Sequence, residues 1–189
     1  MVEDCIRIGG ADWAFEVCIE DPAWDAAVPG WREALARLGA AAAAEVAQRA
    51  AEAGCAAPAE TALALSTDAA VQELNRDWRG IDKPTNVLSF ATWWDDGCPP
   101  PPAPGLPLLL GDLAVARETL LAEAAAETKA PADHFAHLVL HGLLHLLGYD
   151  HQDAAAAREM ESLEIRLLAE IGIADPYGGL DPRGDSDDD

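Results

Sequence analysis

Three of the five histidines stand within one short motif, His141-Gly-Leu-Leu-His145-Leu-Leu-Gly148-Tyr-Asp-His151, at a spacing that can close on one metal ion. His141 and His145 are four residues apart, so on a helix both imidazoles lie on one face and can reach the same ion. Gly148 readily adopts the left-handed backbone with which helices end, and the turn after it brings His151 back toward the first two histidines. Three nitrogen ligands with an open fourth position are typical of a catalytic zinc site. The motif therefore predicts one Zn²⁺ ion on His141, His145 and His151.

The alternative interpretation is that these are core histidines of an apolar helix. Three buried imidazoles without partners would leave polar atoms unsatisfied, which favours the metal site. His137 shares the same helix face, but about 12 Å of helix rise separates it from His145, too far for both to bind one ion. We expect His137 and His134 to lie around the ligands, at the surface or at the helix start. Asp150 can serve either as a general base or as the group that holds a ligand imidazole in its tautomer.

A basic segment stands far upstream of the histidine motif. Arg76, Arg79 and Lys83 are three of only twelve basic residues in the chain. The arginine guanidinium is a planar, permanently charged fork that suits phosphate oxygens, so such a segment near a metal site would suit phosphodiester chemistry. The alternative is a solvated helix end whose bases pair with Asp77 and Asp82.

Length and composition predict one domain. The chain has 189 residues, half of them hydrophobic, which is enough for a single core over residues 1–174. Residues 175–189 hold six acids and one arginine and are predicted to be an acidic, disordered tail. The N-terminus carries acids where a signal peptide has bases, and no apolar run is long enough to span a membrane, so we expect a cytoplasmic protein.

The net charge of −22 disfavours DNA and gives no general affinity for phosphate backbones. An RNA substrate is compatible with this charge in two ways: binding is confined to the basic cleft, or protein partners deliver the RNA. Four scattered cysteines form no CxxC pair and are expected to be reduced bystanders.

The apolar pattern predicts an α/β fold of the layered α+β kind, with about four strands in a mixed sheet, about five helices and the metal-binding helix at the centre. The expected strands are residues 13–20, 61–66, 86–91 and 108–116, the last two paired antiparallel. The expected helices are residues 31–53, 68–79, 117–128, 133–147 and 153–172. Residues 98–107 contain six prolines and are expected to form an extended loop, either variable surface or a polyproline ligand.

Three motifs together resemble the YbeY family of bacterial metal-dependent endoribonucleases. They are the segment Leu74-Asn-Arg-Asp-Trp-Arg-Gly-Ile-Asp-Lys-Pro-Thr-Asn-Val-Leu-Ser-Phe90, then Leu110-Gly-Asp-Leu113, then the histidine motif, in the family's order and approximate spacing. The resemblance covers about residues 60–178, including Asp175-Pro-Tyr177. One departure is Asn86, where many members have aspartate.

The resemblance implies a single-strand-specific zinc endoribonuclease acting in 16S rRNA 3'-end maturation and ribosome quality control. Its partners would be RNA, the ribosome or small-subunit proteins, and ribosome-associated GTPases. His141, His145 and His151 resemble the family's zinc ligands, and Arg79 resembles its functionally important arginine; Arg76 and Lys83 are expected to bind substrate. Zinc would act as a Lewis acid and lower the pKa of its water toward about 7. The nucleophile, water or the RNA 2'-hydroxyl, and the general base stay open.

Two other functions are compatible with parts of the sequence. The histidine spacing also matches HExxHxxGxxH metalloproteases, but those enzymes use the glutamate beside the first histidine as general base, and here that residue is Gly142. The other is a non-enzymatic ribosome assembly factor with a structural zinc. Of the three, the nuclease agrees with most of the residues.

Overall fold

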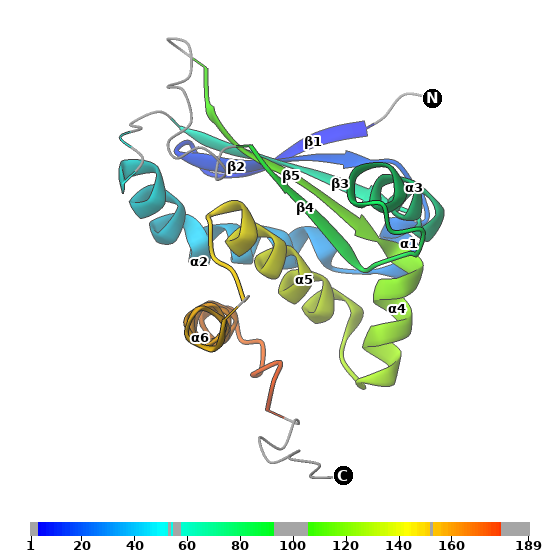
Figure 1. Ribbon diagram of the computed structural model, residues 1–189. Helices are drawn as coiled ribbons and strands as arrows, with labels where there is room; N and C mark the ends of the chain where they lie inside the picture. Colours follow the sequence, from blue (N-terminus) through cyan, green and yellow to red (C-terminus); the bar gives the residue numbers. More distant parts are fainter. Residues whose placement is uncertain (1–3, 53, 55–57, 93–105, 152, 179–189) are drawn as a thin grey trace.

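The computed structural model describes residues 4–52, 54, 58–92, 106–151 and 153–178. These residues form one sheet with helices on both faces (Figure 1). The strands are β1 (Asp4–Gly9), β2 (Trp13–Ile19), β3 (Ala59–Ser66), β4 (Val87–Ala91) and β5 (Leu108–Ala116). The helices are α1 (Trp24–Ala27), α2 (Trp31–Glu52), α3 (Asp68–Arg79), α4 (Arg117–Ala126), α5 (Pro131–Leu146) and α6 (Ala154–Glu170). The predicted layered α/β fold is confirmed.

The sheet is mixed and has the strand order β1-β2-β3-β5-β4. The central pairs β2/β3 and β3/β5 are parallel, whereas both edge strands pair antiparallel with their neighbours. The predicted antiparallel pairing of β4 with β5 is therefore confirmed. Helices α2 and α5 pack on one face of the sheet, with α6 against both of them on the outside, and α3 covers β4 and β5 on the other face (Figure 1). Helix α5 thus lies between the sheet and α6.

The two faces of β4 follow from its alternating side chains. Leu88 is fully buried against Val71 of α3, while Val87 lies on the α5 side, where it approaches Gly142. Gly142 is buried, and a β-carbon there would lie 2.7 Å from Cδ2 of Leu113. The absence of a side chain at residue 142 therefore lets α5 pack closely on β4 and β5.

The sequence interpretation missed two elements. The sheet has five strands rather than about four, because β1 pairs with β2 in an N-terminal hairpin. Six helices are described rather than about five, the additional one being the four-residue α1. The available signal for β1 was the alternation of Ile6 and Ile8 with Cys5 and Arg7, followed by the turn residue Gly9, which the sequence interpretation did not use. The proline-rich loop lies almost entirely outside the described residues.

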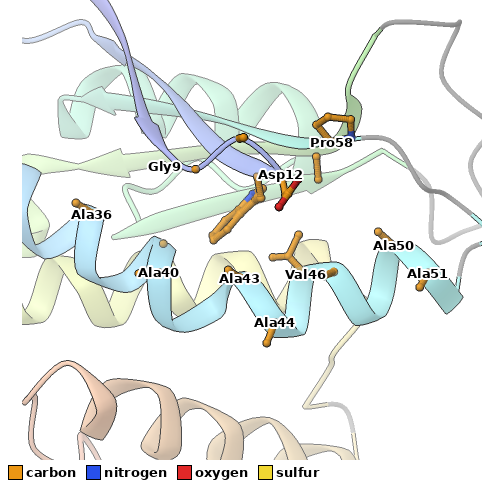
Figure 2. A pocket seen from close by; sticks show the side chains of 16 residues that line it. Gly9, Asp12, Ala36, Ala40, Ala43, Ala44, Val46, Ala50, Ala51 and Pro58 are labelled. Carbon is orange, nitrogen blue, oxygen red and sulfur yellow. The ribbon is translucent and has the colours of Figure 1, made fainter.

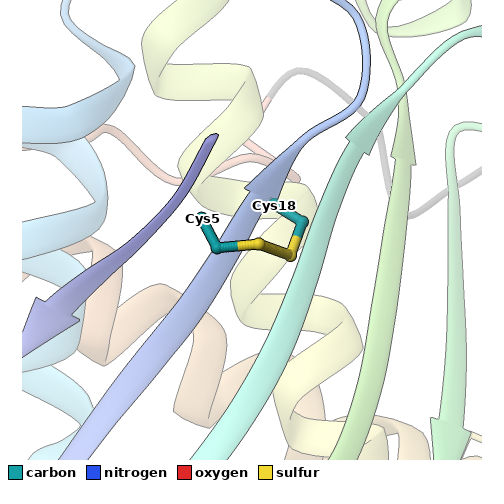
Figure 3. Close-up of a disulfide and its surroundings, with 2 residues drawn as sticks. All are labelled: Cys5 and Cys18. Atoms are coloured by element: carbon teal, nitrogen blue, oxygen red, sulfur yellow. A yellow bond between two sulfur atoms is a disulfide. The ribbon is translucent and has the colours of Figure 1, made fainter. Parts of the chain in front are cut away.

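The prediction that all cysteines are reduced was wrong for one pair. Cys5 and Cys18 form a disulfide between β1 and β2, with their Cα atoms 4.3 Å apart (Figure 3). The two residues stand directly opposite each other in the antiparallel register. Without β1 in the predicted sheet, the sequence separation of 13 residues gave no indication of this proximity.

No helix in the described ranges combines the length and apolarity that a bilayer crossing requires.

Candidate metal centre

Helix α5 carries the first two histidines of the motif. Pro131 stands at its start, where a missing N–H costs nothing, and the helix ends at Leu146. Gly148 has a φ of 83°, the left-handed conformation expected of a helix stop. The N–H of Tyr149 then donates to the carbonyl of Leu144 at 3.0 Å, which fixes the turn leading to His151. The histidine motif thus folds as a helix followed by a sharp return.

The three imidazoles converge on one point. His141, His145 and His151 each offer one ligand nitrogen, and these three atoms lie within 4.8 Å of one another. The Nε2 atoms of His141 and His145 are 3.2 Å apart. Two nitrogens bound tetrahedrally to zinc at about 2.0–2.1 Å are separated by about 3.3 Å, so this spacing fits a shared ion. The donor set and its geometry therefore fit a single Zn²⁺ ion.

Hydrogen bonds to the opposite ring nitrogens orient the first two ligands. Nδ1 of His141 lies 2.9 Å from Oε1 of Glu164, and Nδ1 of His145 lies 3.1 Å from the carbonyl oxygen of Tyr149. An acceptor at Nδ1 holds the proton there and leaves Nε2 with a free lone pair for a metal. Both rings are thus prepared to bind through Nε2.

The pKa of His145 lies below its usual value, chiefly because burial disfavours the charged ring and because His141 and His151 stand close by. A neutral imidazole is the form that binds a metal. Its surroundings therefore keep His145 competent as a ligand.

The sequence interpretation missed Glu164 of α6, which has no exposed surface. Its second oxygen accepts a hydrogen bond from the hydroxyl of Tyr177. Burial acts to raise the pKa of Glu164, but the hydrogen bonds from His141 and Tyr177 outweigh it and hold the pKa below the usual value. Burial and the neighbouring carboxylate raise the pKa of Tyr177, so its hydroxyl stays a donor. The available signal was a carboxylate at residue 164, within the apolar stripe of α6.

In the described part of the chain, neither Asp150 nor His137 forms a hydrogen bond to a ligand imidazole. The Asp150 carboxylate accepts from the N–H of His151 at 2.7 Å, so it shapes the turn, and the carboxylate that contacts a ligand imidazole is Glu164. His137 is largely buried, and its Nδ1 has no hydrogen-bond partner in the described part of the chain. The His137 ring packs edge-on against Tyr177 at 5.9 Å between centroids.

A cavity of about 340 Å³ opens beside the three histidines. Arg79 enters it from the end of α3, where its guanidinium donates to the carbonyl of Ser89 on β4. Among the described residues, no aspartate or glutamate lines this cavity, although the chain has 34 of them. The described lining is Arg79, Thr85, Asn86, Val87, Ser89, His137, Leu138, His141, His145, His151 and Tyr177. The histidine site and Arg79, which are 62 residues apart between Arg79 and His141, therefore share one concave surface, whereas Arg76 and Lys83 are not among its lining residues.

The three basic residues differ in their surroundings. Arg76 is exposed and pairs with Asp77 at 2.9 Å. Asp82 accepts instead from the amide of Gln72. In the part of the chain that the structure describes, neither Arg79 nor Lys83 forms an ion pair, so their positive charges are free to meet a ligand, whereas Arg76 is engaged.

A larger cavity of about 1020 Å³ lies between α2 and the β1–β2 hairpin (Figure 2). Small side chains of α2 line it together with the glycines of the hairpin turn. Its lining contains no histidine and a single carboxylate, Asp12. It therefore has no group of residues capable of acid–base or metal chemistry.

Comparison with known proteins supports one family. The family described as Endoribonuclease YbeY matches residues 33–172. A protein named Endoribonuclease YbeY from Paramagnetospirillum magneticum is 60% identical over 119 residues, which are 63% of this chain and 71% of that protein. Another of that name from Azorhizobium caulinodans is 46% identical over 170 residues, 86% of this chain and 94% of the relative. The solution structure of TM1509 from Thermotoga maritima aligns with a TM-score of 0.49 and 19% identity, over 87% of this chain and 90% of that one. The chain belongs to the YbeY family of endoribonucleases.

Proposed function

We propose that this protein is a zinc-dependent endoribonuclease that cleaves single-stranded RNA, acting in the cytoplasm on the 3' region of 16S rRNA during ribosome maturation and quality control. The observation that carries the proposal is the shared cavity: three histidines placed to bind one metal ion lie beside Arg79, and among the described residues no acid lines this cavity or pairs with that arginine. Metal ligands with a guanidinium beside them suit a phosphodiester, whose oxygens are bound by both.

Each site residue has a proposed role in RNA binding or cleavage that follows from its side chain. His141, His145 and His151 would hold the ion, which when bound supplies a Lewis acid at the phosphate. Arg79 would bind a phosphate oxygen and stabilise the charge that develops during cleavage. Lys83 and Arg76, both exposed, would attract the RNA backbone, Lys83 more strongly because Arg76 is paired with Asp77. Tyr177 and His137 contribute neutral walls to the cavity.

A cavity with no carboxylate among its described lining residues would allow a chain of net charge −22 to bind RNA there. Repulsion from the general surface would restrict binding to the cleft, and delivery by small-subunit proteins or ribosome-associated GTPases would add to selectivity. A protease is disfavoured, since Gly142 supplies no carboxylate and none of the lining residues does.

The test compares the wild type with His145→Ala and Arg79→Ala for bound metal, folding and cleavage of single-stranded RNA. His145→Ala should lose both metal and activity. Arg79→Ala should keep the metal and lose about 100-fold or more in kcat, as for removal of one charge-stabilising donor. Mapping the 3' end of 16S rRNA in cells that carry only Arg79→Ala should reveal unprocessed precursor. Full RNA cleavage by a folded, metal-free His145→Ala protein would refute the proposal.

A further inference from the structure

Trp78 is a solvent-exposed aromatic residue beside the candidate active site. Its exposed fraction is 74%, whereas the other described tryptophans, Trp13, Trp24 and Trp31, are at most 4% exposed. One exposed apolar side chain is common on a protein surface, but here Ile81, three residues further on, is also 50% exposed, so two large apolar side chains face water within four residues. The exposed indole of Trp78 is therefore a candidate ligand-binding surface.

The surroundings hold Trp78 in place. It packs edge-on against Phe90 of β4, with ring centroids 6.1 Å apart. Helix α3 ends one residue later, at Arg79, and Gly80 caps it with a φ of 71°. The buried amide of Asn75 donates to the carbonyl of Lys83 at 2.8 Å and ties down the following loop. A ring held this way loses little conformational freedom when a ligand stacks on it.

Trp78 and Arg79 contact successive residues of the same edge strand, β4. Arg79 contacts the carbonyl of Ser89, which lines the histidine cavity, while Trp78 contacts the next residue, Phe90. Successive side chains of a strand point to opposite faces, and β4 is the outermost strand of the sheet. A chain that leaves the cavity past Arg79 therefore has only the edge of β4 to cross before it meets the indole.

The chemistry of this neighbourhood selects a nucleic acid as the ligand. Arg79 and Lys83 have no ion-pair partner in the described residues, so an exposed aromatic face is accompanied by two free positive charges. Single-stranded RNA presents the matching groups, a π-face on every base and a phosphate between bases. A protein partner that buried Trp78 and Ile81, which is 50% exposed, would have to bury these charges as well or supply acids for them.

We propose that Trp78 is a stacking platform for a base of the RNA substrate, flanking the phosphate that Arg79 binds. The inference rests on the proposed ribonuclease function and adds a second substrate subsite to it. Because every base has a π-face, the platform strengthens binding without selecting a sequence. It also favours single strands, whose bases are free to leave a stack.

The test is steady-state cleavage of a short single-stranded RNA from the 16S 3' region by the zinc-loaded protein. Trp78→Ala should raise KM about 10-fold with kcat changed less than twofold, and Trp78→Phe should restore most of the loss. Leu109→Ala, which removes a side chain with a similar exposed fraction of 58%, is the matched control and should behave as wild type. An RNA that lacks the base at the stacked position should have a higher KM with the wild type, whereas its KM with Trp78→Ala should equal that of the intact RNA.

The outcomes separate the two proposals. A wild type that cleaves RNA normally, together with an unchanged KM in Trp78→Ala, overturns the stacking platform and leaves the ribonuclease function standing. A zinc-loaded wild type that cleaves no RNA overturns the ribonuclease function itself. If Trp78→Ala keeps full affinity for the oligonucleotide but loses binding to 30S subunits, the surface binds protein and the stacking proposal fails.

Discussion

Nδ1 of His141 lies 2.9 Å from Oε1 of Glu164, a carboxylate with no exposed surface that approaches from a different helix. The same carboxylate accepts a hydrogen bond from the hydroxyl of Tyr177. One ligand imidazole is therefore fixed by a residue of α6 and, through it, by a residue of the C-terminal turn. Metal binding should depend on both segments.

Replacing Glu164 should weaken metal binding. In Glu164→Gln the side chain keeps its size but loses its charge and one acceptor, so the His141 ring is held less firmly and its Nε2 becomes less basic. We expect a 10- to 100-fold loss of zinc affinity. Competition titration of the apoprotein with a chromogenic chelator measures it. The exposed Glu161, on the same helix, is the control, and Glu161→Gln should bind zinc as the wild type does. Equal affinities would show that Glu164 serves folding alone.

Gly142 differs from the glutamate of the protease motif, and we also expect the close packing of α5 on the sheet to require a glycine at this residue. A β-carbon at this residue would lie 2.7 Å from Cδ2 of the buried Leu113. Gly142→Ala gains about 1 kcal/mol of helix propensity. Forcing the methyl into the core costs about 1–3 kcal/mol. We therefore expect a net destabilisation of about 1 kcal/mol, measured by urea unfolding.

The control for this prediction is a double-mutant cycle. Leu113→Val shortens the side chain that the methyl would meet, so Gly142→Ala should cost less in that background. Equal costs in both backgrounds would exclude Leu113 as the cause. The Gly142→Glu variant should show no peptidase activity, because a side chain at residue 142 points at Leu113 and Val87 of the sheet and not at the metal site.

Strong local patterns explain which parts of the fold could be predicted. Helix α5 carries a long apolar pattern and a glycine stop, and four of the strands are bounded by turn residues, so their positions follow from the sequence. Strand β1 also has an alternating pattern, with Ile6 and Ile8 followed by Gly9, but the pattern spans only a few residues and was missed. The Cys5–Cys18 disulfide depends on the register of β1 against β2, so without β1 it could not be predicted.

The candidate site divides in the same way. The three histidines lie on one helix and its following turn, where spacing alone determines their proximity. Glu164 and Tyr177 reach the site only because α6 packs on α5, and this packing depends on tertiary contacts that no local spacing encodes. The entry of Arg79 into the histidine cavity likewise depends on α3 ending at the free edge of β4.

The burial of His137 should make the apoprotein sensitive to acid. Burial lowers the pKa of His137 to about 4. The nearby Glu164 opposes the shift, while Lys129, His134 and His141 add to it. The unfolded chain takes up this proton below about pH 6.5 and the folded chain resists it. His137 therefore costs no stability above about pH 6.5, and the folded state loses about 3 kcal/mol through this residue as the pH falls to about 4.

Urea unfolding of the metal-free protein at several pH values tests the role of His137. Using apoprotein removes the separate effect of ligand protonation on metal binding. The wild type should lose stability between pH 6.5 and 4 more steeply than His137→Phe, which keeps an aromatic ring but does not titrate. Superimposable pH profiles would mean that His137 is protonated as easily in the folded state as in the unfolded chain.

Asn86 should be required as the uncharged amide in this chain, although many family members have aspartate there. Its Nδ2 donates to both oxygens of Glu123, at 3.1 and 3.0 Å, and Glu123 also contacts His134 at 2.8 Å. In Asn86→Asp, two carboxylates would face each other and the donor would be lost, so we expect a destabilisation of about 1–3 kcal/mol at pH 7. The cost should shrink below about pH 5, where carboxylates begin to take up protons.

The control is the double variant Asn86→Asp with Glu123→Gln, in which the new amide supplies a donor and should restore the stability, measured as Tm. A double variant no more stable than Asn86→Asp would show that repulsion from Glu123 is not the cause.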